Sequence, residues 1–378
     1  MKIINRIIAG AMALFAQFQM LNPCESLFPK DLGIPTAESY ADEQRLASSV
    51  WDMEACDGIL YVGAGDFGAN TGPTPIWSFD MEEETWSVSA TVEDEAVCSF
   101  RKVGDTLIAP GIDSTVTSWE FGNYHTLSDG QWSSFQKLPG AVHNFDVTQY
   151  DGMYFFALGT ADGESSPVLV SADGMGDFEP IPFYKGEKEL LDGKFSHTRV
   201  YDFFTADNGL YCLLYCYADG KITDRMYCRY EEGAFCYISD AEFTPTPWKQ
   251  IPVMGKVCVE NAQYFTTGTL YKTEDFVTVT PVEIPDGGTV TDLYTYQLGE
   301  RQLLYALSNT KNEDDTYTAT VYLIGENVTA IASYTATAPA LSLVRSGICF
   351  YLGLGGSAKL PDTGKVVRLS VFDRLLNP

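Results

Sequence analysis

One short pattern recurs along this chain and limits the folds open to it. An aspartate is followed by an apolar residue and, six or seven positions later, by a glycine that opens a strand rich in Leu, Tyr, Phe and Val. Successive aspartates are 94, 56 and 90 residues apart, close to multiples of about 47, so degenerate copies are expected in the gaps. The four clear aspartates are Asp52, Asp146, Asp202 and Asp292, and weaker copies cover Val97–Gly111, Lys256–Tyr271 and Leu341–Gly355.

Each repeat contains four short stretches of alternating hydrophobicity separated by turns. In the first unit these include Ile59–Asp66, Ile76–Asp80 and Trp86–Val92, joined by loops rich in Gly, Pro and acidic residues. Such alternation is typical of half-buried β-strands. Four-stranded units repeated at this period indicate a β-propeller, whose blades bury their faces only against one another. We therefore expect an all-β propeller with seven four-stranded blades, in which residues 38–47 supply the last blade's fourth strand and close the ring.

Two local motifs resemble known propeller families. Phe79–Trp86, FDMEEETW, resembles the kelch turn between the third and fourth strands, and GILYVGAG from Gly58 is similar to the kelch second strand. Ser171–Phe178, SADGMGDF, is similar to an Asp-box, with Met175 where glycine is expected. The resemblance implies that Trp86 and Phe178 pack between blades and that the motif aspartates stabilise their own turns. It supports the fold and not a particular function, because propellers host many activities.

The N-terminus has the features of an export signal. Lys2 and Arg6 precede an apolar run that ends near Phe18, which is short for a membrane span and suits a signal-peptide core. The cleavage site is weak, so an uncleaved anchor and an ordinary packed helix remain as alternatives. We expect a secreted or cell-surface monomer with a signal-like segment at 1–22, a linker with a ring-closing strand at 23–47, and one propeller at 48–378.

The charge limits the partners. Fifty-one acidic against 24 basic residues give a formal net charge of −27. This charge repels polyanions, so nucleic acid and anionic membrane surfaces are not expected as partners, whereas cations and neutral sugars remain compatible. Nine cysteines show no zinc-binding spacing. Cys212, Cys228 and Cys236 fall near one another if tight turns join their strands. Two of them could then form a disulfide, or all three could be small buried hydrophobes.

The repeated aspartates are expected around one opening of the ring. In a propeller, the loops that lead into first strands and those between second and third strands share one face, called here the loop face. Asp52, Asp146, Asp202 and Asp292 begin first strands, so their carboxylates should surround the axis at that face. They would repel one another unless paired, hydrated or bridged by a cation, and Ca²⁺ is the candidate ion. Alternatively, each aspartate binds backbone amides of the neighbouring blade.

Residues that break the repeat are further candidates for the loop face. His143, His197 and Arg199 come just before or at the start of consecutive first strands, where they could bind a polar ligand, donate a proton or serve as ordinary surface residues. Aromatics interleaved with polar side chains in three long loops suit sugar recognition by stacking and hydrogen bonding. The loop candidates are Asp66, Phe67, Asn70, Asp113, Trp119 and Tyr124, with Trp119 equally suited to the core of a strand.

The catalytic motifs that the sequence lacks favour a binding function over an enzymatic one. Serine nucleophile elbows, P-loops and dinucleotide fingerprints in their proper strand–helix context are absent from the sequence. The Asp-box resemblance raises sialidase-like hydrolysis, but the Phe-Arg-Ile-Pro segment of that family is missing. We therefore predict an extracellular binding module that presents its loop face to a glycan or protein. The alternatives are a carbohydrate-active hydrolase or lyase with a His/Arg/Asp funnel, and a structural component.

Overall fold

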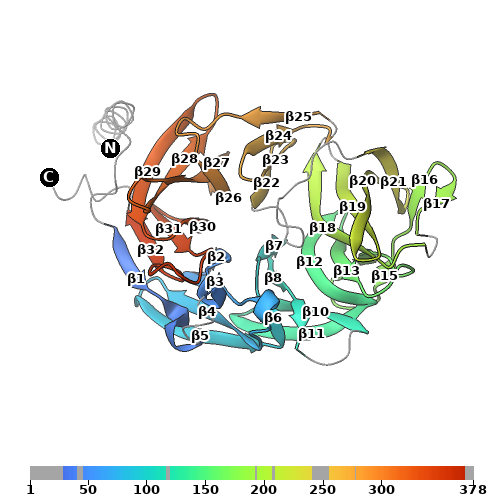
Figure 1. Ribbon diagram of the computed structural model, residues 1–378, viewed down its shortest axis with the longest axis horizontal. Helices are drawn as coiled ribbons and strands as arrows, with labels where there is room; N and C mark the ends of the chain where they lie inside the picture. Colours follow the sequence, from blue (N-terminus) through green and yellow to red (C-terminus); the bar gives the residue numbers. More distant parts are fainter. Residues whose placement is uncertain are drawn as a thin grey trace.

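The computed structural model describes residues 29–40, 46–115, 120–191, 194–206, 209–240, 255–276 and 278–370. Their strands form sheets arranged in a ring, antiparallel except for one parallel pair in the largest sheet, with the first strand of each repeat nearest the centre (Figure 1). The all-β propeller expected from the repeat is therefore confirmed. Short 3₁₀ segments lie between strands, among them η1 (Pro35–Glu38) and η3 (Phe67–Ala69). No helix in these described ranges is long and apolar enough to cross a bilayer.

Within the described residues, five sheets have four strands each, in chain order from the axis outward apart from the closing strand described below. The strands are β2 (Asp52–Cys56), β3 (Ile59–Gly63), β4 (Thr74–Asp80) and β5 (Thr85–Val92); β7 (Arg101–Val103), β8 (Thr106–Pro110), β10 (Phe121–Ser128) and β11 (Gln131–Pro139); β22 (Gly255–Val259), β23 (Ala262–Thr266), β24 (Leu270–Thr273) and β25 (Val279–Val282); β26 (Thr289–Leu298), β27 (Arg301–Lys311), β28 (Tyr317–Ile324) and β29 (Val328–Ala336); and β30 (Ala340–Ser346), β31 (Cys349–Leu354), β32 (Val366–Ser370) and β1 (Lys30–Gly33).

The last of these sheets joins the two ends of the ring. Its outer strand is β1, which pairs antiparallel with β32, with Lys30 opposite Arg368. Both of these bases also contact Glu84 of the first sheet. The ring-closing strand therefore lies at residues 30–33 and not at the predicted 38–47, where the described residues form turns and 3₁₀ structure.

The rest of the ring is one twelve-stranded sheet, so the prediction of seven separate four-stranded blades is wrong: five stand alone. Pairing between repeats merges the remaining strands, because Gly159 of β13 pairs with Arg199 of β18, and His143 of β12 pairs with Ile112 of β9. The strands of this sheet are β6 (Asp94–Ala96), β9 (Ile112–Ser114), β12 (Ala141–Tyr150), β13 (Met153–Thr160), β14 (Val168–Ser171), β15 (Glu179–Pro180), β16 (Phe183–Lys185), β17 (Lys188–Glu189), β18 (His197–Ala206), β19 (Gly209–Ala218), β20 (Lys221–Glu231) and β21 (Ala234–Asp240).

The Asp-Gly pairs of the repeat form the hairpins between first and second strands. Asp57 and Gly58 both have positive φ, 49° and 82°, and they connect β2 to β3 as a two-residue loop. Asp151 and Gly152, at 49° and 76°, do the same between β12 and β13. Two consecutive left-handed residues match the twist of antiparallel strands, which is why Asp-Gly suits this turn.

The two motifs with family resemblance stabilise their own turns. Asp80 Oδ1 accepts the backbone amides of Glu82 and Glu83, at 2.9 Å each, between β4 and β5. Asp173 Oδ1 accepts the amide of Met175 at 2.8 Å in the turn after β14. The aromatic that closes each motif packs against the neighbouring blade: Trp86 Nε1 donates to the carbonyl oxygen of Leu32 in β1 at 2.7 Å, and the Phe178 ring lies 5.9 Å from that of Tyr124 in β10. The expected structural roles are found, while the family resemblance itself stays a prediction.

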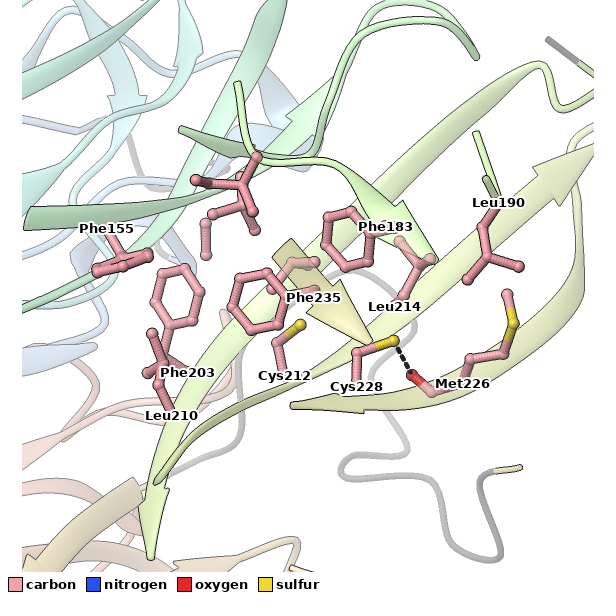
Figure 2. Packing of buried hydrophobic residues seen from close by; sticks show 14 of the residues in the cluster. Phe155, Phe183, Leu190, Phe203, Leu210, Cys212, Leu214, Met226, Cys228 and Phe235 are labelled. Carbon is pink, nitrogen blue, oxygen red and sulfur yellow. Dashed lines mark hydrogen bonds between the residues drawn. The ribbon is translucent and has the colours of Figure 1, made fainter. Parts of the chain in front are cut away.

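The hydrophobic core is divided into clusters that lie between consecutive repeats. Figure 2 shows one of them, in which Phe155 of β13 and Phe183 meet Phe203, Leu214 and Phe235. Cys212 and Cys228 are opposite each other on β19 and β20 and are buried in this cluster (Figure 2). All eight cysteines in the described ranges are free thiols, so the disulfide considered from the sequence is not formed and Cys212 and Cys228 serve as small buried hydrophobes.

Candidate functional site

The four repeated aspartates surround the axis of the ring, but three of them are bound by the next repeat. Asp52 Oδ2 accepts the amide of Phe100 at 2.7 Å, and Asp146 Oδ2 accepts that of Phe203 at 2.8 Å. Asp292 Oδ2 accepts the amide of Leu343 at 2.7 Å. In each case the donor comes from the first strand of the next repeat, one residue after the position that corresponds to the repeated aspartate. These carboxylates therefore tie neighbouring repeats together, as in the structural alternative considered from the sequence.

Two basic side chains neutralise the aspartates on one side of the axis. Arg101 Nε donates to Asp146 Oδ1 at 2.6 Å, and an Arg101 guanidinium nitrogen lies 3.8 Å from Asp52 Oδ2. Lys256 Nζ contacts Asp146 and lies 3.3 Å from Asp202 Oδ1. Burial alone would raise the pKa of Asp146, but Lys256 and Arg101 hold it below its ordinary value. Asp146 is therefore a buried carboxylate between two cations.

The axial aspartates do not fit the predicted Ca²⁺ site. Among the described residues, no three His, Cys, Asp or Glu side chains are grouped closely enough to hold a metal ion. Positive charge at Asp146 comes instead from Arg101 and Lys256, which would repel a divalent cation.

The other side of the axis keeps carboxyl groups that are poorly stabilised as anions. Burial raises the pKa of Asp292 well above its ordinary value, and the nearby charge of Asp52 raises it further. Burial also raises the pKa of Asp52, against the opposing effect of Arg101. In the part of the chain that the structure describes, Asp292 makes no ion pair within 4.0 Å. This side of the axis therefore favours neutral carboxyl groups that donate as well as accept hydrogen bonds.

A cavity of about 840 Å³ follows the axis between these strands. Towards the loop face its wall contains Leu46, Trp51, Phe67, Cys98 and Leu341, so that end is largely apolar and aromatic. The charged layer of Asp52, Arg101, Lys256 and Asp292 lies next along the strands. Ligand pockets typically have a few hundred to about 1,000 Å³, mostly apolar walls and a few placed polar groups. This cavity has the size and the mixed lining of a small-ligand site.

The opposite end of the cavity has its own polar group, near the hairpins that join first to second strands. Tyr294 Oη donates to Glu54 Oε1 at 3.3 Å, and burial, followed by the charge of Asp52, raises the pKa of Glu54 to about 7. The Arg345 guanidinium lies 4.2 Å from the ring centre of Tyr296. Glu54 is therefore a carboxyl group able to donate a proton near neutral pH at the cavity wall.

The loop face brings together the three candidates that break the repeat. His143 Nδ1 lies 3.0 Å from Asp113 Oδ1, and the His143 ring stacks on Phe145 at 5.0 Å. The His197 ring stacks on Tyr217 at 4.3 Å, and the Arg199 guanidinium lies 5.3 Å from the same ring. Burial lowers the pKa of His197, and the charges of Arg199 and His143 lower it further. The grouping is as expected, and its role in ligand binding stays a prediction.

Other loop candidates serve their own turns or the core. Asp66 caps η3, accepting the amide of Gly68 at 3.0 Å, and Asn70 ends η3 in a left-handed conformation. Burial raises the pKa of the adjacent Glu95 to about 7, with contributions from Asp113 and other carboxylates. Tyr124 is fully buried between aromatic rings rather than on the loop face. Trp119 lies outside the described residues.

The site residues that the sequence did not single out are Arg101, Lys256, Glu54 and Tyr294. Arg101 and Lys256 belong to the two repeats that have Ser99 and Gly255 near the position of the aspartate. A base close to the place where the repeat loses its acid is the signal that could have identified both. Glu54 and Tyr294 lie two residues after a repeated aspartate on the same face of their strands, a position that carries no distinguishing pattern.

Fold and site together define a β-propeller protein with an axial cavity. No protein-family model matches the chain, and no curated protein matches it. Among solved structures it is similar to a chain of BBS1N in complex with ARL6DN, soaked with lead, at 11% identity over 91% of this chain and 96% of that chain, with a TM-score of 0.52.

A chain of a mitotic checkpoint complex is similar at 10% identity, with 93% of this chain and 96% of that chain covered and a TM-score of 0.51. The extracellular domain of a one-component system from B. thetaiotaomicron has 10% identity, coverage of 80% and 44%, and a TM-score of only 0.43. At such identities the two likenesses with TM-scores above 0.5 show the propeller fold alone.

Proposed function

We propose that the protein is a binding module that takes a neutral glycan into the axial cavity from the loop face. The observation that carries this proposal is the 840 Å³ cavity whose wall places Trp51 and Phe67 beside buried carboxyl groups. Aromatic faces stack on the apolar faces of sugar rings, and carboxyl groups bind hydroxyls as acceptors or, when protonated, as donors. The protein's charge of −27 disfavours an acidic ligand.

The test is a glycan array probed with the full-length protein, once with Ca²⁺ and once with EDTA. The expected result is a hit that is unchanged by EDTA and about tenfold weaker in Phe67→Ala, because one stacking ring is lost. Phe121→Ala is the matched control, since Phe121 is an exposed phenylalanine of β10, away from the cavity lining. Silence on the array, or equal weakening by both variants, would reject the glycan proposal.

A protein ligand is the second candidate. Two solved propeller chains with similar folds come from complexes, one of BBS1N with ARL6DN and one the mitotic checkpoint complex. That context supports a protein partner for this ring without identifying one. Glycan silence combined with a partner that co-purifies with wild type and is lost in Phe67→Ala would favour this candidate. We expect either ligand to be met outside the cell, in keeping with the signal-like segment at residues 1–22.

We also infer that the twelve-stranded sheet acts as two blades, β12–β15 and β18–β21, so that the ring has seven repeats. The support is the core, in which six buried clusters each lie between two consecutive repeats. A seventh, which contains Ile112, Phe145 and Phe265, extends over four repeats. An experimental structure would test this inference through the hydrogen bonds between β13 and β18. A continuous ladder in place of the single Gly159–Arg199 pair would contradict it.

A further inference from the structure

A hydrogen-bonded chain of three residues, outside the cavity, connects the second four-stranded sheet with β6 of the twelve-stranded sheet. Ser134 Oγ lies 2.8 Å from His125 Nδ1, and His125 Nε2 lies 2.7 Å from Asp94 Oδ2. Ser134 and His125 are opposite each other on β11 and β10, and Asp94 begins β6. The pairing of β10 with β11 therefore positions Ser134 beside His125. The segment between the first and second repeats, which contains β6, brings the Asp94 carboxylate to the opposite nitrogen of the imidazole.

The burial of the three residues is graded from inside to outside. Asp94 and His125 are each 1% exposed, whereas Ser134 is exposed on the outermost strand of its sheet. The imidazole is therefore shielded from water and reaches the surface only through the Ser134 hydroxyl. An external reagent would meet the serine oxygen first.

The carboxylate sets the tautomer of the imidazole. Asp94 Oδ2 can only accept, so Nε2 of a neutral His125 carries the proton and Nδ1 is left as the acceptor for the Ser134 hydroxyl proton. Asn123 Nδ2 donates to the same Asp94 oxygen at 3.1 Å and helps to hold the carboxylate in place. This arrangement has the roles of nucleophile, general base and orienting acid, which are recognised by geometry rather than by sequence order.

Asp94 also keeps unused acceptor capacity. In the part of the chain that the structure describes, its second oxygen, Oδ1, is buried and has no hydrogen-bond partner. Its negative charge is therefore not shared among further donors and can stabilise an imidazolium formed at His125. A buried carboxylate oxygen without a partner destabilises the folded state, so a purely structural role does not explain its presence.

We propose that Ser134 is a nucleophile for acyl transfer from esters, with His125 as its general base and Asp94 as the positioning residue. Ser134 Oγ attacks the ester carbonyl carbon while its proton moves to His125 Nδ1. Collapse of the tetrahedral intermediate breaks the carbon–alkoxy bond, and the alcohol leaves with the proton from His125. Water then hydrolyses the acyl-serine by the same proton transfers, which releases the carboxylic acid and restores the hydroxyl. The outer edge of β11 pairs with no described strand, so its amides can donate to the developing oxyanion.

The first experiment treats the full-length protein with a fluorophosphonate, which forms a serine–phosphorus bond and releases fluoride, and locates the label by peptide mass spectrometry. We expect one adduct, at Ser134. Ser134→Ala should abolish it, and Ser133→Ala is the matched control because Ser133 is an exposed serine on the same strand without a histidine contact. A label on Ser133 and Ser134 alike, or none at either, would overturn the proposal.

A second measurement separates activation from exposure. His125→Gln and Asp94→Asn should slow labelling of Ser134 about a hundredfold or more, as expected for loss of general-base catalysis. Circular dichroism of each variant checks the fold, and the wild-type comparison of Ser134 with Ser133 stands even if a buried variant does not fold. Unchanged labelling in a folded His125→Gln protein would leave the three residues a structural network only.

Discussion

Replacement of Lys256 by methionine is expected to destabilise the ring at its axis. Lys256 supplies one of the two positive charges around Asp146, and its side chain is 11% exposed, against 1% for Asp146 and 3% for Asp202. Methionine has a similar length and removes the ammonium group and its contact with the Phe203 carbonyl oxygen. Removal of the only partner of a buried charge costs about 3–5 kcal/mol of unfolding free energy. Arg101 still pairs with Asp146 after the substitution, so this range is an upper bound for Lys256→Met.

The loss of stability in Lys256→Met should also depend on pH in a definite direction. The pKa of Asp146 is lower in the folded protein than in the unfolded chain, so it contributes stability above its unfolded pKa of about 4 that is lost as the pH falls through its folded value. Lys256→Met removes the ammonium charge, which lowers this pKa more than any other neighbouring group. The difference in unfolding free energy between wild type and variant should therefore be largest at pH 7 and shrink as the pH falls and Asp146 becomes protonated.

The assay is urea denaturation of wild type and variant at pH 7 and at pH 3.5. Lys272→Met is the matched control, because Lys272 pairs with Glu274 on the surface, where the loss should be at most about 1 kcal/mol. A Lys256→Met protein that loses no more stability than Lys272→Met, or whose deficit grows as the pH falls, would refute the assignment of Lys256 as the counter-ion of Asp146.

Two further perturbations test other parts of the ring. The pKa of Glu54 is raised to about 7, so the folded state keeps this proton to a higher pH than the unfolded state. The unfolding free energy should therefore fall between about pH 4.5 and pH 7, by at most about 3 kcal/mol. Glu54→Gln should flatten that loss in urea titrations across the same range, and an unchanged slope would contradict the assignment. Gly353→Ala should cost about 1–3 kcal/mol, because its Cβ would lie 2.2 Å from Val50 Cγ1, whereas Gly176→Ala meets nothing within 4 Å and should be close to neutral in thermal unfolding.

The sequence was sufficient for features that depend on local conformation and on repetition. Asp57 and Gly58 predict their turn because positive φ is a property of those residue types. The position of Asp52 at the axis follows from its place at the start of an inner strand. Neither argument needs knowledge of the neighbouring repeat.

The features that the sequence did not predict arise between repeats. Whether Asp52 binds Ca²⁺ or the Phe100 amide depends on the distance between two blades, which no local pattern encodes. The merging of β13 with β18 through Gly159 and Arg199 likewise depends on how two blades are spaced. Arg101 and Lys256 were missed for the same reason, since each acts on aspartates of other repeats.

The pairing of β1 with β32 has a consequence for how the chain folds. Lys30 and Arg368 are partners in one ladder although more than 330 residues separate them. During synthesis the strand made early must remain without its partner until nearly the whole propeller has emerged, and every inner repeat lies within that loop. The entropy of closing a loop grows only slowly with its length, so the final pairing is thermodynamically affordable but late. Until then β32 keeps an unpaired outer edge, and deletion of residues 30–33 would leave that edge exposed and susceptible to edge-to-edge association.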